Sequence, residues 1–216
     1  PGSQQVLDSW YAGNCSAALL ERYMAQEGFV SVIVDGRGTG GRGAEFEKQT
    51  YLKLGQLESH DQVETAIYLS KLPWVDAKHI GIWGWSFGGF NTLMSMSEGR
   101  PVFYAGVAVA PPTSWRYYDS IYTEIYNGLP QDNPTGYDDN SPINFADRLS
   151  DKTRLLIIHG TADDNVHFQN TIEMCRALNR AAKQYDMMVY PDQNHSMRPD
   201  DMFNIRQKMA DYCIEN

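Results

Sequence analysis

Residues 84–89 read Gly84-Trp85-Ser86-Phe87-Gly88-Gly89, and they lie between a short apolar run at 79–83 and a helix-like run at 90–97. A serine at the apex of a sharp, strained turn between a strand and a helix holds its Oγ clear of the sheet. The glycines two residues before and two residues after it leave room where side chains would collide. The backbone N–H of Phe87 then points toward a reacting carbonyl. The stretch therefore predicts a nucleophile elbow with Ser86 as the nucleophile.

Strand-like and helix-like segments alternate on both sides of this elbow. Alternation of this kind is typical of a mostly parallel sheet with helices on both faces, and with the elbow it predicts the α/β-hydrolase fold. Residues 1–216 are expected to form one such domain. The expected strands are 29–34, 79–83, 102–110, 154–159 and 186–190, and the expected helices are 16–26, 59–71, 90–97, 168–183 and 200–214. Leu19, Leu20, Tyr23 and Met24 are expected to form the apolar face of the first helix.

Composition excludes several classes of protein. The chain has 216 residues, of which 42% are hydrophobic, and no apolar run approaches the roughly 20 residues of a membrane helix. A net charge of −9 disfavours a nucleic-acid partner or an anionic membrane surface. Three cysteines (Cys15, Cys175 and Cys213) make no disulfide framework, and none has metal-ligand spacing. A serine hydrolase mechanism needs no metal or cofactor, so none is expected.

The glycine-rich segment 35–43 superficially resembles a phosphate-binding loop. Its register is not that of G-x-G-x-x-G opening a helix, and no lysine-serine pair of a P-loop follows. We therefore interpret it as a flexible loop at the carboxyl edge of a strand.

An aromatic-rich insertion at 113–147 interrupts the alternation. An insertion at the carboxyl edge of the sheet, near the elbow, is where elements that shape a substrate pocket occur. We expect at least two of its aromatic side chains to line a pocket, although they could instead fill a satellite core. Its aromatic residues are Trp115, Tyr117, Tyr118, Tyr122, Tyr126 and Tyr137.

A nucleophilic serine needs a base and a carboxylate that orients the base. In this fold they follow in the order serine, acid, histidine, each on a loop after a later strand. The strand at 154–159 is followed by Asp163 and Asp164, between which the pattern does not decide. The strand at 186–190 is followed by His195, which we predict to be the base. His60 is expected to be exposed, and His159 is expected to have a structural role beside the acid loop. His79 opens the elbow strand at its opposite end and His167 begins a helix, so neither is favoured as the base.

Several motifs resemble the prolyl oligopeptidase family, and specifically its enzymes of the dipeptidyl peptidase IV type. The elbow is one of them, and the resemblance extends over essentially the whole chain. The others are Asp35-Gly36-Arg37-Gly38, Ala110-Pro111, the stretch from Trp115 to Glu124, and the stretch from His159 to Phe168.

The resemblance implies a serine exopeptidase that releases dipeptides from free amino termini, with proline or alanine in second position. It assigns the acid of the triad to Asp163 and the contact with a substrate carbonyl to Asn165. It also implies a proline-sized S1 pocket lined by Phe87, Trp115, Tyr118, Tyr122 and Val166. The alternatives are a related acyl hydrolase (an esterase, an acylaminoacyl-peptidase or an oligopeptidase) and an inactive binding module on the same fold.

Two departures from the family pattern concern the pocket and the oxyanion site. Pro112 stands where a small aliphatic residue is usual. The family takes its second oxyanion donor from a tyrosine in a Tyr-x-Gly-Pro turn, and Pro1-Gly2-Ser3-Gln4 resembles the end of that turn. The tyrosine would then precede Pro1, with Tyr11 as a less suitable substitute.

The sequence opens without an initiator methionine, so we expect a piece of a longer protein that lacks the first strands of its sheet. The resemblance further implies an upstream β-propeller that binds the amino group of the substrate, a homodimer, and an extracytoplasmic location.

Overall fold

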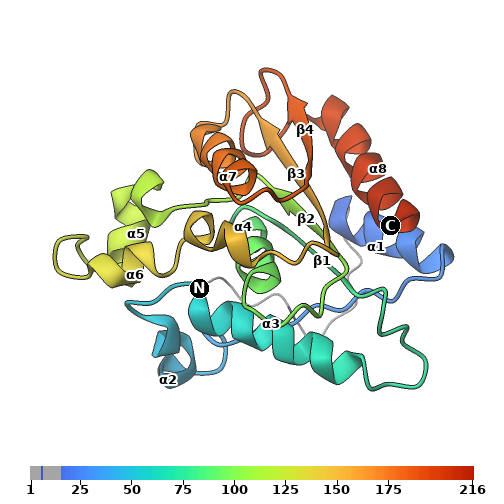
Figure 1. Ribbon diagram of the computed structural model, residues 1–216, viewed down its shortest axis with the longest axis horizontal. Helices are drawn as coiled ribbons and strands as arrows, with labels where there is room; N and C mark the ends of the chain where they lie inside the picture. The colour runs from blue at the N-terminus through green and yellow to red at the C-terminus, as the bar shows by residue number, and fades with distance from the viewer. Residues whose placement is uncertain (1–5, 7–15) are drawn as a thin grey trace.

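The computed structural model describes Val6 and residues 16–216, which form an α/β-hydrolase fold around a parallel sheet (Figure 1). Within these residues the sheet has four strands in the order β1-β2-β3-β4, and every neighbouring pair is parallel. The fold class predicted from the sequence is therefore confirmed. The strands are β1 Gly81–Trp85, β2 Ala105–Val109, β3 Arg154–Gly160 and β4 Asp186–Tyr190.

Helices occupy the connections between the strands, close to the predicted ranges. The α-helices are α1 Ser16–Gln26, α2 Ala44–Glu47, α3 Gln56–Leu69, α4 Phe87–Met96, α5 Ser120–Asn127, α6 Pro134–Asp138, α7 Gln169–Arg180 and α8 Pro199–Glu215. The 3₁₀ helices of the described residues are η1 Lys48–Thr50, η2 Trp115–Tyr117 and η3 Pro142–Arg148. No described helix is both long enough and apolar enough to cross a membrane.

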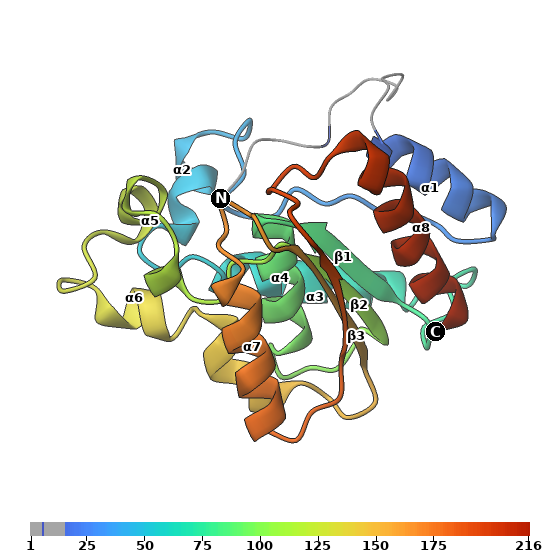
Figure 2. The same ribbon diagram turned by 90° about the horizontal axis from the view of Figure 1, so that it is seen from above.

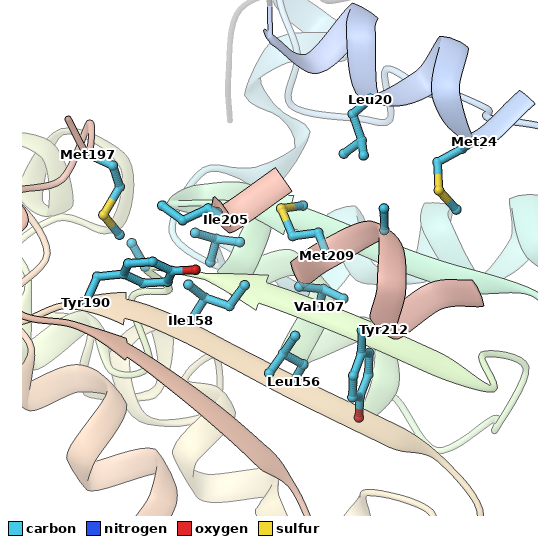
Figure 3. Packing of buried hydrophobic residues seen from close by; sticks show 13 residues of the cluster. Leu20, Met24, Val107, Leu156, Ile158, Tyr190, Met197, Ile205, Met209 and Tyr212 are labelled. Atoms are coloured by element: carbon cyan, nitrogen blue, oxygen red, sulfur yellow. The ribbon is translucent and has the colours of Figure 1, made fainter. Parts of the chain in front are cut away.

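The central strands send alternate side chains to opposite faces of the sheet. Val107 of β2 and Leu156 of β3 pack with α1 and α8, whereas Ile157 packs with α3, α4 and α7 (Figure 2). Figure 3 shows the first of these layers, in which Ile205 of α8 reaches the sheet. Burying an aliphatic side chain of this size contributes roughly 1.5–3 kcal/mol to stability. Both faces are therefore covered, which explains the continuous apolar runs of the strands.

One predicted strand is wrong. Residues 29–34 pair with no strand among the described residues, and the side chains of Val30 and Ile33 are 65% and 49% exposed. The apolar run suggested burial, but a strand needs a neighbouring ladder to satisfy its backbone. The side chain of Gln62 on α3 does reach this segment, donating to the carbonyl of Val34 at 3.4 Å.

The apolar face of α1 is narrower than the sequence predicted. Leu20 and Met24 are buried against α8 and the sheet, whereas Leu19 and Tyr23 are exposed. The two buried positions are four residues apart and therefore share one side of the helix.

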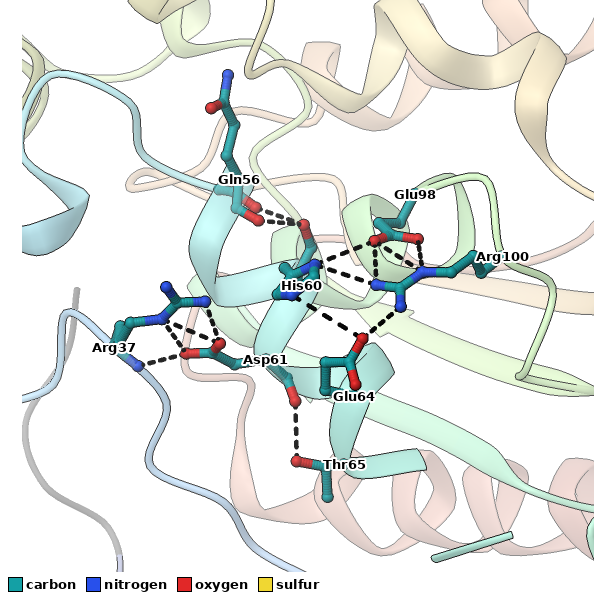
Figure 4. A network of polar contacts seen from close by, with 10 residues as sticks. Arg37, Gln56, His60, Asp61, Glu64, Thr65, Glu98 and Arg100 are labelled. Carbon is teal, nitrogen blue, oxygen red and sulfur yellow. Dashed lines mark hydrogen bonds and ion pairs between the residues drawn. The ribbon is translucent and has the colours of Figure 1, made fainter. Parts of the chain in front are cut away.

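Charged side chains fix the surface of α3 to its neighbours (Figure 4). Arg37, from the glycine-rich loop, donates to both oxygens of Asp61 at 3.1 and 3.0 Å, and its backbone N–H adds a bond of 2.8 Å. Arg100 donates to Glu98 at 2.9 Å and contacts His60 of α3 at 3.0 Å. The loop predicted to be flexible is thus tied to α3 by a bidentate ion pair.

The strand register brings the carboxyl ends of all four strands to one edge of the sheet. Trp85 pairs with Val109, Val109 with Ile158, and Gly160 with Tyr190. The loops that follow these strands therefore meet at this edge, where ligands bind in open α/β sheets.

Candidate active site

Ser86 sits between the end of β1 and the first residue of α4. Its backbone has φ 58° and ψ −119°, a conformation that costs a residue with a side chain on the order of 1–3 kcal/mol. Two backbone bonds hold it there: its N–H donates to Val109 at 2.8 Å, and its carbonyl accepts from Phe90 at 3.0 Å. The turn therefore has the strained geometry that the nucleophile elbow predicts.

The glycines around Ser86 differ in how closely neighbouring atoms approach them. A Cβ on Gly84 would lie 2.3 Å from the backbone of Gly88, and a Cβ on Gly89 would lie 2.8 Å from the carbonyl oxygen of Val109. A Cβ on Gly88 would meet no atom within 4 Å. The expectation of a collision at Gly88 is therefore wrong, because the crowded positions are Gly84 and Gly89.

The N–H of Phe87 belongs to the first residue of α4. The first N–H groups of a helix have no acceptor within the helix, and they carry the positive end of its dipole. This position is suited to an oxyanion. The sequence-based candidates for a second donor are a tyrosine before Pro1, which is not part of this sequence, and Tyr11, which lies outside the described residues.

Asp163 is buried on the loop after β3 and accepts four hydrogen bonds. Its Oδ1 accepts the backbone N–H groups of Asn165 at 3.0 Å and Val166 at 2.8 Å. Its Oδ2 lies 2.8 Å from Nδ1 of His195 and 3.1 Å from Nε2 of His159. The neighbouring carboxylate, Asp164, is exposed and lines a cavity instead.

These contacts determine the charge of Asp163. Burial raises the pKa of this carboxyl group. Hydrogen bonds from His159, His195 and the backbone N–H of Asn165 lower it by more than burial raises it, so the pKa of Asp163 lies well below its usual range. Asp163 is therefore a carboxylate at neutral pH, which is the form that accepts a proton-bearing Nδ1.

The loop of His195 is tied both to the acid loop and to the elbow. The N–H of Ala162 donates to the carbonyl of Gln193 at 3.1 Å, and Asp192 donates through its N–H to Oγ1 of Thr161 at 2.9 Å. The indole Nε1–H of Trp85, next to the nucleophile, donates to the carbonyl oxygen of His195 at 3.1 Å. The half-buried imidazole is thus held between the carboxylate and the turn that carries Ser86.

The other histidines lie elsewhere, with one exception. His60 and His79 are partly exposed and contact Glu98 and Asp76, respectively. His167 precedes α7 and lines the cavity beside Asp164. The exception is His159, which was expected to have a structural role beside the acid loop and contacts Asp163 itself.

The aromatic insertion supplies both a satellite core and a cluster of rings beside the elbow. Trp115 is buried with Phe90, and its ring centroid lies 4.6 Å from that of Phe90. The ring of Tyr122 stacks on Trp115 at 6.2 Å and meets Tyr118 at 5.4 Å, and Phe87 lies 6.2 Å from Trp115. The buried rings form a satellite core, whereas the lining of a substrate pocket by the partly buried rings stays a prediction.

Tyr118 connects this cluster to the acid loop. Its hydroxyl donates to Oδ1 of Asn165 at 2.7 Å, and burial is the main reason that the pKa of this hydroxyl is raised. Because Oδ1 accepts this bond, Nδ2 is the group with which exposed Asn165 can donate to a substrate carbonyl.

A cavity of about 420 Å³ is lined in part by this pair, Tyr118 and Asn165. Its lining residues include Asp119, Asp164 and Tyr117, but not Trp115, Tyr122 or Val166. It therefore shares Tyr118 with the predicted proline-sized pocket, and it includes Asn165, the residue predicted to contact a substrate carbonyl. Within the described residues, no group of three or more His, Cys, Asp or Glu side chains is arranged to hold a metal ion.

Comparison with known proteins identifies the family of this chain. The profile of the prolyl oligopeptidase family matches residues 17–216. A protein of Arthroderma benhamiae named "Probable dipeptidyl-aminopeptidase B" is 46% identical over 200 residues, which make up 91% of this chain and 21% of that protein. A relative of the same name from Arthroderma otae is 43% identical, covering 99% of this chain and 23% of its own length.

The crystal structure of Porphyromonas gingivalis dipeptidyl peptidase 4 superposes with a TM-score of 0.93 and 45% identity, covering 100% of this chain and 30% of that one. The chain thus spans about a fifth of the length of these curated relatives. The family match and these relatives establish that the chain belongs to the prolyl oligopeptidase family.

Proposed function

We propose that this chain is the catalytic domain of a serine dipeptidyl peptidase in which Ser86, His195 and Asp163 form the triad. One observation carries the proposal: Nδ1 of His195 lies 2.8 Å from a buried carboxylate, and Trp85 bonds the same histidine to the elbow of Ser86. Family membership and the names of the relatives support the reaction class.

In the proposed reaction, Nε2 of His195 takes the proton of Ser86 Oγ as the oxygen attacks the scissile carbonyl. Asp163 holds the Nδ1–H tautomer and stabilises the imidazolium that forms. The Phe87 N–H donates to the developing oxyanion. The imidazolium then protonates the leaving amine, and a water molecule activated by the same base releases the dipeptide from the acyl-enzyme.

Substrate choice is proposed to depend on the aromatic cluster. Phe87, Trp115, Tyr118 and Tyr122, with Val166 beside the acid loop, would enclose an apolar pyrrolidine ring or a methyl group at the second residue of the substrate. Such a pocket discriminates by about 1–3 kcal/mol per methylene, which favours proline or alanine over bulkier residues. The amide of Asn165 would donate to the substrate carbonyl that precedes the scissile bond.

Features beyond this chain complete the proposal. The relatives are about four to five times longer, which supports a longer parent protein. We propose that its upstream part is a β-propeller that binds the free amino group, that the enzyme forms a homodimer, and that it works outside the cytoplasm.

The test is hydrolysis of Gly-Pro p-nitroanilide and of its N-blocked analogue, by this chain and by the longer protein. A dipeptidyl peptidase requires activity of the longer protein on the free amine and a strong preference over the blocked substrate. Equal cleavage of both substrates would instead identify a general acyl hydrolase with the same triad.

A further inference from the structure

A second histidine lies against the carboxylate of the proposed triad. His159 is the penultimate residue of β3, and none of its side chain is exposed. It points to the face of the sheet that α7 covers, because its ring contacts Phe168 at 5.5 Å and Thr171 of α7 at 2.7 Å. No step of the proposed reaction uses it.

The contacts of His159 determine its tautomer. Its Nε2 lies 2.8 Å from the carbonyl oxygen of Val166 and 3.1 Å from Oδ2 of Asp163. Both partners are acceptors, so Nε2 must carry the proton. The hydroxyl of Thr171 can then donate to Nδ1, and a neutral imidazole satisfies all three contacts at once.

We propose that His159 is a positioning residue of the triad, whose Nε2–H holds Oδ2 of Asp163 at the point where that oxygen accepts the Nδ1–H of His195. The inference rests on the proposed function. Backbone N–H groups fix only the other oxygen of the carboxylate, so without His159 the orientation of Oδ2 depends on its contact with His195 alone.

His159 also contributes to the ionisation of Asp163. Burial raises the pKa of Asp163, and the hydrogen bond from His159 opposes this effect along with the bond from His195. Among the described residues, the titratable groups in contact with Asp163 are these two histidines, while α7 presents the neutral Thr171 toward His159. Removing the donor makes the coupled pair of Asp163 and His195 easier to protonate, which moves the acid limb of kcat/KM to higher pH.

The experiment compares His159→Gln with His159→Asn in the full-length enzyme. The amide nitrogen of glutamine reaches the position of Nε2, whereas that of asparagine reaches only the position of Nδ1. The Asn variant is expected to lose about 10–100-fold in kcat, the effect of one hydrogen bond to a charged group, with KM within about twofold. Its acid limb is expected to move to higher pH, and the Gln variant is expected to recover most of both effects.

Ile157→Val serves as the control for a weakened strand. Ile157 is buried on the same face of β3, two residues earlier, and its replacement lowers stability by a packing effect alone. All variants are measured well below the lowest of their thermal unfolding midpoints, and labelling by a fluorophosphonate counts the competent sites.

Equal kcat and equal acid limbs in the Gln and Asn variants would overturn the inference, as would a loss confined to KM. If the wild-type enzyme is not labelled at Ser86, the proposed function fails and this inference fails with it. Labelling of the wild type together with equal variants overturns the positioning role only.

Discussion

Replacing Asp163 by asparagine tests how the acid loop controls the base. Oδ1 of Asp163 is held by the backbone N–H groups of Asn165 and Val166 at 3.0 and 2.8 Å. The carbonyl oxygen of an asparagine keeps these two bonds, which places its NH₂ group where Oδ2 was. That group then faces Nδ1 of His195 at about the original 2.8 Å, and Nε2 of His159.

The NH₂ group can only donate to His195, so Nδ1 must become an acceptor and the proton moves to Nε2. A protonated Nε2 cannot take the proton of Ser86. Loss of the correct tautomer in triads of this kind lowers kcat by about 10⁴-fold, which corresponds to roughly 5.5 kcal/mol of transition-state stabilisation. KM should stay within about threefold, because Asp163 is buried and is proposed to act through His195.

The assay is steady-state hydrolysis of Gly-Pro p-nitroanilide by the full-length enzyme, with circular dichroism to verify the fold. Asp164→Asn is the matched control, since Asp164 is the adjacent, exposed carboxylate. Its kcat should stay within about threefold of the wild type. An Asp163→Asn enzyme within tenfold of the wild type, or an equal loss in both variants, would refute the reasoning.

Three further effects follow from the same geometry. Gly84→Ala places a Cβ 2.3 Å from the Gly88 backbone and should lower the free energy of unfolding by about 1–3 kcal/mol, whereas Gly88→Ala should be close to neutral. Tyr118→Phe removes the bond that orients Asn165 and should raise KM about threefold to tenfold in peptide hydrolysis. The lowered pKa of Asp163 means that its charged contacts stabilise the fold above about pH 4 and are lost as the pH falls, so urea titrations from pH 5 to pH 3 should show a steeper loss of stability for the wild type than for Asp163→Asn.

Each of these effects has a contradicting result. Equal stability losses for Gly84→Ala and Gly88→Ala would mean that the close approach at Gly84 does not govern the elbow. A Tyr118→Phe change seen in kcat alone would remove Asn165 from substrate binding. Parallel pH dependence of the wild type and Asp163→Asn would show that Asp163 does not have a lowered pKa in the folded state.

The fold and the elbow could be predicted because their signals are local. The spacing around Ser86 requires a strand on one side and a helix on the other, and the structure places β1 and α4 there. The loops of Asp163 and His195 could be placed at one edge because parallel strands share the edge at which they end.

What the sequence did not predict depends on contacts between distant segments. The apolar residues 29–34 were expected to be a buried strand, but burial depends on a neighbouring ladder that the run itself does not encode. Whether a position requires glycine depends on whether backbone atoms of another segment lie close to it. Such atoms lie close to Gly89 but not to Gly88.

The sequence predicted a structural role for His159 beside the acid loop, but it did not predict the contact of His159 with the acid itself. His159 and Asp163 are four residues apart, and only the turn between them brings Nε2 within 3.1 Å of Oδ2. The position of His159 at the end of a strand, directly before Gly160, was the signal for the predicted structural role. The same turn distinguishes the two candidate acids, because it buries the carboxylate of Asp163 and exposes that of Asp164.

The most direct test of the proposed triad is covalent labelling of the full-length enzyme with a fluorophosphonate, followed by mass spectrometry of the modified peptide. The account predicts one modified residue, Ser86, with labelling abolished in Ser86→Ala and strongly slowed in Asp163→Asn. Modification of a different serine, or full peptidase activity in Ser86→Ala, would contradict it.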